Sequence, residues 1–278
     1  HVINQVCGSG LRSVASAYQS IKLGENKIIV AGGQENMSKT PHAIFYREDK
    51  KLSEDKLIDT MIYDGLIDSF NNYHMGVTAE NVAAKYKISR DDQDSFSLKS
   101  QVKTQRAIRE SKFKDEIIKL QVKKNDKNFI FEKDEHPRNN ITLETLKSLK
   151  AVFKDNGTVT AGNSSGLNDG AAAVVLMSRE EAELRTINPL AKIVSWATCG
   201  VEPALMGLGP IPAVKMALKK AKWKIDDVDL FEINEAFAAQ SIAVIRDLKI
   251  PEEIVNVNGG AIALGHPIGA SGTRILVT

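Results

Sequence analysis

The chain has 278 residues, of which 42% are hydrophobic and 26% are charged, so it can bury a sizeable core and is long enough for more than one domain. Lys and Arg number 37 and Asp and Glu 35, a near balance that does not predict nucleic-acid binding. No apolar run approaches the roughly 20 residues that a membrane span requires, so we expect no membrane partner.

The two cysteines, Cys7 and Cys199, cannot build a disulfide framework. This indicates a reducing compartment, and we expect a cytoplasmic location. The chain opens on His1 inside an apparent strand and stops where a helical pattern has just begun, without a C-cap signal. We therefore expect a fragment of a longer protein, incomplete at both ends.

The N-terminal segment has an α/β pattern. Residues 1–6 form an apparent strand, and a Cys-Gly turn follows. Apolar residues then recur at helical spacing over 9–23, with Gly24 placed to end the helix, and 27–33 is typical of a buried strand. The order strand, turn, helix, strand predicts an α/β fold.

The middle of the chain, 40–168, is more polar and is expected to be an inserted loop domain. Its clearest element begins at Ser89, where Asp92 three residues later completes a capping-box pattern, and runs as a helix to about Glu110. Residues 121–140 are charged around a small apolar centre, which favours a solvated hairpin or loop.

Strands and helices alternate again after residue 168. We expect buried strands at 171–178 and 190–201, shorter strands at 229–234 and 254–258, and helices at 211–223 and 235–249. Loops at the carboxyl ends of strands are where open α/β sheets build sites, so the residues that follow these strands are the first candidates for chemistry.

Cys7 lies where the first strand gives way to a helix. Helix N–H groups and the positive end of the helix dipole should lower the pKa of a thiol there, which is the setting of a nucleophile. A small buried side chain at a tight turn is the plainer alternative for Cys7 taken alone.

Three further stretches carry polar groups at strand ends. His266 lies in "GGAIALGHPIGASG", Asn234 in "EINEAF", and hydroxyls and amides gather in "TAGNSSGLNDG" at 160–170. A glycine-rich turn, a helix cap and an ordinary loop would explain each one singly. Together, Cys7, His266 and Asn234 supply a nucleophile, a base and an oxyanion partner.

These motifs resemble those of the thiolase family. "NQVCGSG" is similar to its nucleophile motif, "NEAF" to its asparagine motif, "GGAIALGHPIGASG" to its histidine motif and "TAGNSSGLNDGAAA" to its coenzyme A loop, and "GPIPA" is also typical. Their order matches across essentially the whole chain. The resemblance implies two similar α/β halves in a five-layered arrangement, with an inserted loop domain and both ends incomplete.

The resemblance implies an acetyl-CoA acetyltransferase that forms or cleaves acetoacetyl-CoA. Cys7 would carry the acyl group, His266 would take its proton, and Asn234 would orient a water in the oxyanion hole. The family's base for the Claisen step is a second cysteine beyond the histidine motif. That motif does not occur before Thr278, and Cys199 in "SWATCGVEP" does not match it. We therefore expect acylation of Cys7 without condensation.

The resemblance also implies a substrate pocket. "NNYHMG" is similar to the acyl-pocket segment of short-chain members. The residues expected to bind substrate are Ser165, His74, Met75, Arg138, Phe237, Leu66, Phe153 and Ala161.

By the same resemblance, the N-terminal half comprises 1–39 and 169–189, the loop domain 40–168 and the C-terminal half 190–278. Acetyl-CoA, acetoacetyl-CoA and coenzyme A are the expected ligands, with no cofactor and no metal, and the protein is expected to form a homodimer or homotetramer.

Three alternatives each account for part of the sequence. A ketoacyl synthase shares the fold and the cysteine nucleophile, but "NEAF" and "GHPIGASG" together are not expected in one. A papain-type protease would pair Cys7 with a histidine about 130 residues on, such as His136, yet it lacks the rest of that nucleophile motif. A decayed thiolase that only binds coenzyme A or partner subunits is the non-catalytic alternative.

Overall fold

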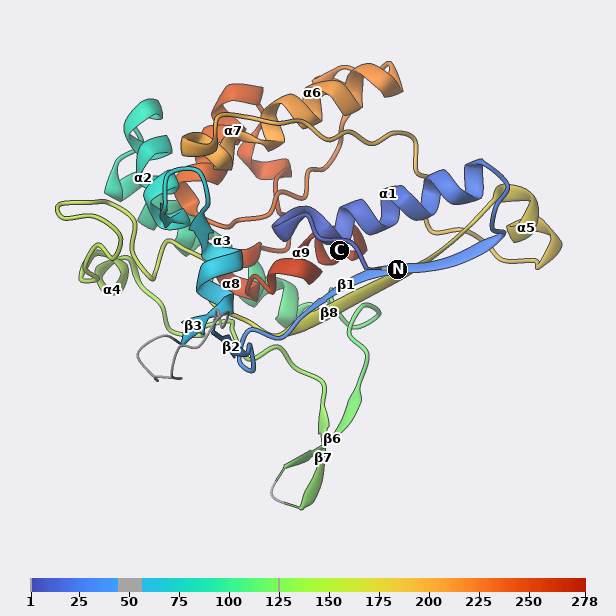
Figure 1. Ribbon diagram of the computed structural model, residues 1–278, viewed down its shortest axis with the longest axis horizontal. Coiled ribbons are helices and arrows are strands. Elements are labelled where there is room, and N and C mark those ends of the chain that lie inside the picture. The colour runs from blue at the N-terminus through green and yellow to red at the C-terminus, as the bar shows by residue number, and fades with distance from the viewer. Residues whose placement is uncertain (1, 45–56, 125) are drawn as a thin grey trace, which may run out of the picture.

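A long antiparallel ribbon of two strands organises one side of the molecule (Figure 1). In the computed structural model, which describes residues 2–44, 57–124 and 126–278, β1 (Ile28–Glu35) pairs with β8 (Gly170–Met177). Ile28 lies opposite Met177 and Glu35 lies opposite Gly170, so the register is continuous over eight residues of each strand. The pairing joins two segments that are far apart in the sequence.

One face of this ribbon is covered by helices. Helices α1 (Ser9–Lys22) and α9 (Ile268–Val277) pack beside each other and against both strands (Figure 1). Ala31 and Leu176 on that face are buried with Val14 of α1, whereas Val30 on the other face is 70% exposed. The strands predicted at 27–33 and 171–178 are therefore confirmed. The prediction that they are buried on both faces is wrong, because their side chains alternate between a covered face and an open one.

Helix α1 confirms the prediction for 9–23. Its apolar residues recur on one face, and Val14, Ala15 and Ala17 are buried. The chain leaves the helix through Gly24, whose φ of +78° is a conformation that glycine adopts without steric cost.

A second apolar core surrounds α7 (Ala238–Leu248), a helix built almost wholly from small and aliphatic residues. Nine of its eleven residues are buried, so it is enclosed on nearly every side. It packs against α2 (Met75–Tyr86), α3 (Arg90–Arg109), α6 (Pro210–Ala221) and the 3₁₀ turn η4 (Pro203–Leu208). This core holds in place the loop that precedes α7, which carries Asn234.

The expected helix in the middle segment is confirmed in detail. Ser89 Oγ accepts the Asp92 N–H and the Asp92 carboxylate accepts the Ser89 N–H, which is the predicted capping box at the start of α3. Helix α2 was not expected, because no Ser, Thr, Asp or Asn stands directly before its first residue. His74 takes the capping role instead, and its Nδ1 accepts the Gly76 N–H.

Short elements connect the β1–β8 ribbon and its helices with the core around α7. The predicted hairpin is confirmed as β6 (Leu120–Lys124) and β7 (Lys127–Phe131), and it projects away from the body (Figure 1). The remaining short elements are η1 (Val6–Gly8), β2 (His42–Ala43), β3 (Ile58–Asp59), η3 (Met61–Leu66), β4 (Ile67–Asp68), β5 (Tyr73–His74), α4 (Leu143–Lys147), α5 (Arg179–Leu184), η5 (Ile225–Asp227), η6 (Glu252–Ile254) and α8 (Ala261–Leu264).

Several expected strands are absent from the part of the chain that the structure describes. Residues 2–5 have no regular structure, and His1 lies outside the described residues. Residues 190–201 have no ladder partner there, and the strands expected at 229–234 and 254–258 reduce to one parallel bridge between Phe231 and Val255. A strand requires a hydrogen-bonded neighbour, which the apolar pattern of a segment does not supply.

The start of α7 also differs from the prediction. Helix α7 begins at Ala238 and not at Glu235, because 234–237 form an extended loop. Ser164 bridges Phe237 in that loop, and the Ala238 N–H donates to the carbonyl of Asn163. Contacts with a distant segment therefore override the local helical pattern.

Candidate active site

Cys7 occupies a tight turn immediately before α1. The turn η1 covers Val6–Gly8, and Val6 has a φ of +47°. The left-handed region is unfavourable for a β-branched residue, so the residue before the cysteine is strained. Such strain in front of a nucleophile candidate is a feature that the sequence does not reveal.

His266 is fixed by contacts on both sides of its ring and at its backbone. It follows Gly265, whose φ is +97°, in the three-residue connection between α8 and α9. Its backbone N–H donates to Asn168 Oδ1 at 3.0 Å. Its Nδ1 lies 2.5 Å from Ser271 Oγ, which is one turn into α9. The imidazole is only 6% exposed, so its orientation is set by protein groups.

Cys7, His266 and Asn234 meet at the ends of three segments that are distant in sequence. His266 Nε2 lies 3.1 Å from Cys7 Sγ and 3.3 Å from Asn234 Nδ2. The structure therefore brings together the three residues that the motifs pointed to. A nucleophile in hydrogen-bond contact with a base, and a base held by a further group, is the arrangement that covalent catalysis requires.

The hydrogen bonds of His266 determine which ring nitrogen is free. Ser271 Oγ lies 3.0 Å from the carbonyl of Pro267, which only accepts hydrogen bonds. The hydroxyl therefore donates to that carbonyl and accepts from Nδ1–H. Nε2 is then left with its lone pair facing Cys7, as a general base for the thiol proton requires.

Burial keeps both members of the Cys7–His266 pair neutral. The pKa of the Cys7 thiol is raised to about 11, chiefly by burial, although a hydrogen bond from its own backbone lowers it in part. The pKa of His266 is lowered to about 4, first by burial and then by the positive charge of Arg274. The expectation that the Cys7 pKa falls is therefore wrong, because desolvation outweighs the polar turn.

Close packing of α1 on α9 sets the distance between thiol and imidazole. A Cβ added at Gly272 of α9 would lie 2.5 Å from the Leu11 backbone nitrogen of α1, and one added at Gly10 would overlap Thr273. The two helices can approach this closely only because both positions are glycine. Cys7 and His266 stand just before these helices, so the helix contact holds them together.

Asn234 lies in the extended loop that precedes α7. Its Nδ2 faces His266, and its Oδ1 is buried without a hydrogen-bond partner in the described part of the chain. A buried acceptor with no protein partner is suited to hold a water or a ligand N–H or O–H group.

Aromatic side chains expected in the substrate pocket lie in one group. The His74 ring stacks on Phe153 with centroids 4.6 Å apart and planes 17° from parallel. Phe153 meets Phe237 edge to face, with centroids 6.2 Å apart. Burial lowers the pKa of His74, which favours the neutral ring for apolar stacking. Three residues from separate segments thus make a common wall.

The loop at 160–170 is attached to the asparagine loop. Ser165 donates both its backbone N–H and its Oγ–H to the carbonyl of Ala236, at 3.0 and 3.1 Å. Asn163 is fully buried, and its Nδ2 donates to Asp94 of α3 at 3.0 Å. This loop is therefore a fixed wall and not a mobile connection.

The remaining predicted residues are more scattered. Met75 is the first residue of α2 and Leu66 the last of η3. Arg138 is exposed, and its backbone bonds to Gln101 and Gln105 of α3, while Ala161 is exposed in the turn before Asn163. None of the hydrogen bonds or ring contacts in the described residues joins these four to the Cys7 group.

His136 is not the partner of Cys7. Its Nδ1 lies 3.3 Å from Asn168 Nδ2, and burial lowers the pKa of the ring. The histidine beside the cysteine is His266, which argues against the protease alternative. Sequence reasoning missed Asn168 and Ser271 as the contacts of His266, although both lie in motifs that it had singled out.

Nothing in residues 2–44, 57–124 and 126–278 gathers three or more His, Cys, Asp or Glu side chains in a way that could hold a metal ion. Within these same residues, every helix is too short or too polar to cross a membrane. The described contacts place a thiol, an imidazole and an amide beside an aromatic wall. Such a site defines an α/β protein equipped for acyl transfer through a cysteine.

Comparison with known families and proteins gives the more particular assignment. The model of the thiolase N-terminal domain matches residues 1–180, and that of the thiolase C-terminal domain matches residues 187–278. An acetyl-CoA acetyltransferase of Paracoccus denitrificans is 56% identical over 277 residues, which are 100% of this chain and 71% of that protein. A probable acetyl-CoA acyltransferase of Staphylococcus aureus is 51% identical over 99% of this chain and 71% of that protein.

Solved structures agree with this match. The crystal structure of the Bacillus anthracis acetyl-CoA acetyltransferase superposes with a TM-score of 0.95 at 45% identity, over 99% of this chain and 70% of that one. The crystal structure of the human mitochondrial 3-ketoacyl-CoA thiolase in complex with CoA superposes with a TM-score of 0.93 at 42% identity, over 99% of this chain and 69% of that one. The chain therefore belongs to the thiolase family and has the thiolase fold.

Proposed function

We propose that the chain is an acyl-CoA acyltransferase that forms or cleaves acetoacetyl-CoA through an acyl-cysteine intermediate on Cys7. The contact between Cys7 Sγ and His266 Nε2, at 3.1 Å, is the observation that carries the proposal. The relatives named acetyl-CoA acetyltransferase, at 55–56% identity, support this acyl group and this reaction.

Acylation begins from the neutral pair. As Cys7 Sγ attacks the thioester carbonyl, its proton passes to His266 Nε2, and the carbonyl oxygen becomes an oxyanion. The carbon–sulfur bond to coenzyme A then breaks, and His266 returns the proton to the departing sulfur. Transfer of the proton during attack avoids a free thiolate, which the burial of Cys7 disfavours.

The oxyanion requires donors that are already in place. A water held by the unpartnered Asn234 Oδ1 and the protonated Nε2 of His266 are the two donors that we assign. Preorganised donors of this kind contribute about 3–4 kcal/mol each in enzymes where one has been removed. Asn234 is therefore assigned to transition-state stabilisation and not to coenzyme A affinity.

The aromatic wall is assigned to the acyl and pantetheine part of the substrate. His74, Phe153 and Phe237 present ring faces and edges, which suit a short acyl chain and a thioester. Ser165, Met75, Leu66, Ala161 and Arg138 are assigned to the same substrate, with Arg138 at the nucleotide end. The neutral His74 ring favours uncharged acyl groups over charged ones.

The setting of the reaction is part of the proposal. Coenzyme A thioesters are the substrates, with no resident cofactor, and a cytoplasmic location suits the two free cysteines. We propose a homodimer or homotetramer, to which the hairpin β6–β7 contributes, because Leu120, Ile130 and Phe131 on it are exposed. The three-part domain division stays a prediction.

Isotope exchange between labelled coenzyme A and acetyl-CoA tests the proposal, since exchange requires the acyl-cysteine step alone. The wild-type protein should exchange label, and Cys7→Ala should not. Binding of coenzyme A by calorimetry without any exchange would contradict the proposal and favour a protein that only binds coenzyme A.

A further inference from the structure

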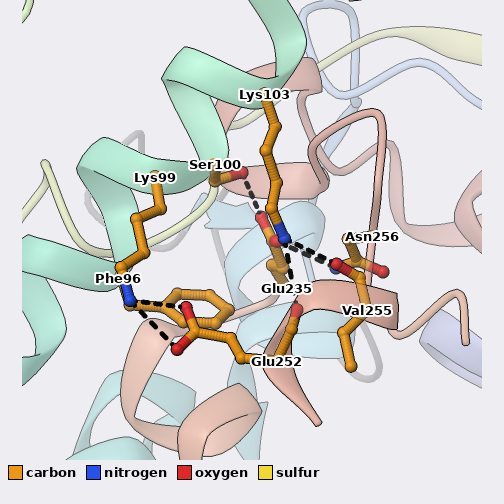
Figure 2. Close-up of a pocket in the computed structure, with 8 residues that line it drawn as sticks. All are labelled: Phe96, Lys99, Ser100, Lys103, Glu235, Glu252, Val255 and Asn256. Carbon is orange, nitrogen blue, oxygen red and sulfur yellow. Dashed lines mark hydrogen bonds and ion pairs between the residues drawn. The ribbon is translucent and has the colours of Figure 1, made fainter.

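Glu235 is a buried carboxylate that the acyl-transfer chemistry does not use. It directly follows Asn234 in sequence and is 1% exposed. No ion pair forms with it in the described part of the chain, and Lys103 nearby donates to the carbonyl of Val255 instead (Figure 2). A carboxyl group in such a place requires other hydrogen-bond partners, because burying a polar group without them is costly.

Three donors from three segments converge on this carboxyl group. Oε2 accepts from Ser100 Oγ of α3 at 2.7 Å and from the Ile262 N–H of α8 at 3.2 Å, and Oε1 accepts from Asn256 Nδ2 at 2.8 Å. Figure 2 shows Ser100 and Asn256 approaching it from opposite sides. The group is therefore the point where α3, the segment before α8 and α8 itself are joined.

These partners in turn hold both catalytic segments. Asn256 Oδ1 accepts the Ile233 N–H and Asn256 Nδ2 donates to the Ile233 carbonyl, each at 2.8 Å. Asn256 therefore fixes the backbone directly before Asn234. Ser100 Oγ also accepts the Gly260 N–H at 3.1 Å. Gly260 stands directly before α8, and His266 lies two residues after the end of that helix.

We infer that Glu235 is the positioning residue of the site: its carboxyl group ties the Asn234 loop to the α8–His266 segment and so fixes the amide of Asn234 beside His266. The inference rests on the proposed acyl transfer, and it assigns to Glu235 no contact with substrate. Glu235 directly follows Asn234, whose Nδ2 lies 3.3 Å from His266 Nε2, so a shift of the Glu235 backbone would be passed on to that contact.

The pattern of donors explains why the residue must be an acid and not an amide. Both oxygens accept, so a glutamine would place its NH₂ group against Asn256 Nδ2 or against the Ile262 N–H. In the second arrangement Ser100 Oγ could accept from the amide, but the Ile262 N–H only donates and would still face the NH₂ group. Glu235→Gln thus keeps the shape and forces one buried donor against another.

A double-mutant cycle tests the inference. The rate of acetyl transfer from acetyl-CoA to Cys7 is measured by rapid quench and intact mass for the wild type, Glu235→Gln, Asn234→Ala and the double variant. Glu235→Gln should slow transfer roughly ten- to a hundredfold, the usual scale for groups that orient a catalytic residue. In the Asn234→Ala background it should slow transfer less than about threefold, since the residue it positions is already absent.

Glu181→Gln is the matched control. Glu181 of α5 is also a buried acid, but it pairs with Arg185 just after that helix, far from the site (Figure 1), so this variant should keep the wild-type rate. Ser100→Ala, which removes one donor and keeps the carboxyl group, replaces Glu235→Gln if the latter does not fold, and the same non-additivity is expected.

The possible outcomes separate the two claims. A normal rate for Glu235→Gln, or the same slowing in both backgrounds, overturns the positioning role while acyl transfer stands. An Asn234→Ala variant that transfers acetyl at the wild-type rate overturns the positioning role too, because the residue to be positioned then has no function. A wild-type protein that takes up no acetyl group overturns the proposed function together with the inference.

Discussion

The contact between α1 and α9 provides a quantitative prediction about the distance between thiol and imidazole. In Gly272→Ala the new Cβ would lie 2.5 Å from the Leu11 backbone nitrogen, whereas ordinary contact begins at 3.4 Å. The backbone of Leu11 is part of a helix and cannot yield alone, so α9 must move from α1 by about 0.9 Å. The gap of 3.1 Å between Cys7 and His266 would then open to about 4 Å.

A displacement of about 1 Å in an active site can cost on the order of a hundredfold in rate. Acetylation of Cys7 by acetyl-CoA should fall by about that factor in Gly272→Ala, as measured by quenched-flow mass spectrometry well below the melting temperature. Affinity for coenzyme A, measured by calorimetry, should change less than about threefold, because the aromatic wall stays in place.

Gly200→Ala is the control for this substitution. A Cβ there meets nothing within 4 Å, and the residue has no positive φ, so acetylation should stay at the wild-type rate. If the folded Gly272→Ala protein acetylates as fast as Gly200→Ala, then the packing of α1 on α9 does not set the catalytic distance, and the reasoning is refuted.

Three further predictions concern the thiol, the aromatic wall and the strained turn. The pKa of Cys7 is raised to about 11 and that of His266 is lowered to about 4, so the thiolate fraction of Cys7 increases with pH. Alkylation of Cys7 by iodoacetamide should therefore become steadily faster from pH 6 to about 9. An alkylation rate that is flat across this range would show a preformed thiolate–imidazolium pair. Phe153→Ala removes the ring stacked on His74 and should raise the KM for acetyl-CoA in the isotope exchange with coenzyme A about tenfold, with Phe153→Leu between the two. An unchanged KM would remove Phe153 from the substrate wall. Val6→Gly relieves the strain of a positive φ at a β-branched residue. It should raise the free energy of unfolding by about 1 kcal/mol in urea titrations and should slow acetylation. A loss of stability would show that the turn is not strained.

The sequence pointed to three side chains that the structure brings into contact, but not to the arrangement around them. Cys7, His266 and Asn234 could be picked out because each interrupts a local pattern with a reactive side chain beside glycines or at a strand end. The segment with Ser89 and Asp92 could be predicted in detail, since a capping box is a local interaction.

Features that depend on distant contacts could not be predicted. The pKa of Cys7 rises because α9 and the His266 loop bury it, and neither is near in sequence. Helix α7 starts at Ala238 and not at Glu235, because the Ala238 N–H donates to the carbonyl of Asn163. Glu235 resembled an ordinary first-turn helix acid, and only its three partners from α3, Asn256 and α8 reveal a buried junction.

The most direct test of the account is the intact mass of the purified protein after it is mixed with acetyl-CoA, followed by peptide mapping. The account predicts a gain of one acetyl group, located on Cys7, that is reversed by added coenzyme A and absent in Cys7→Ala. No gain in a folded protein that binds coenzyme A, or an acetyl group located on Cys199, would contradict the assignment of Cys7 as the nucleophile.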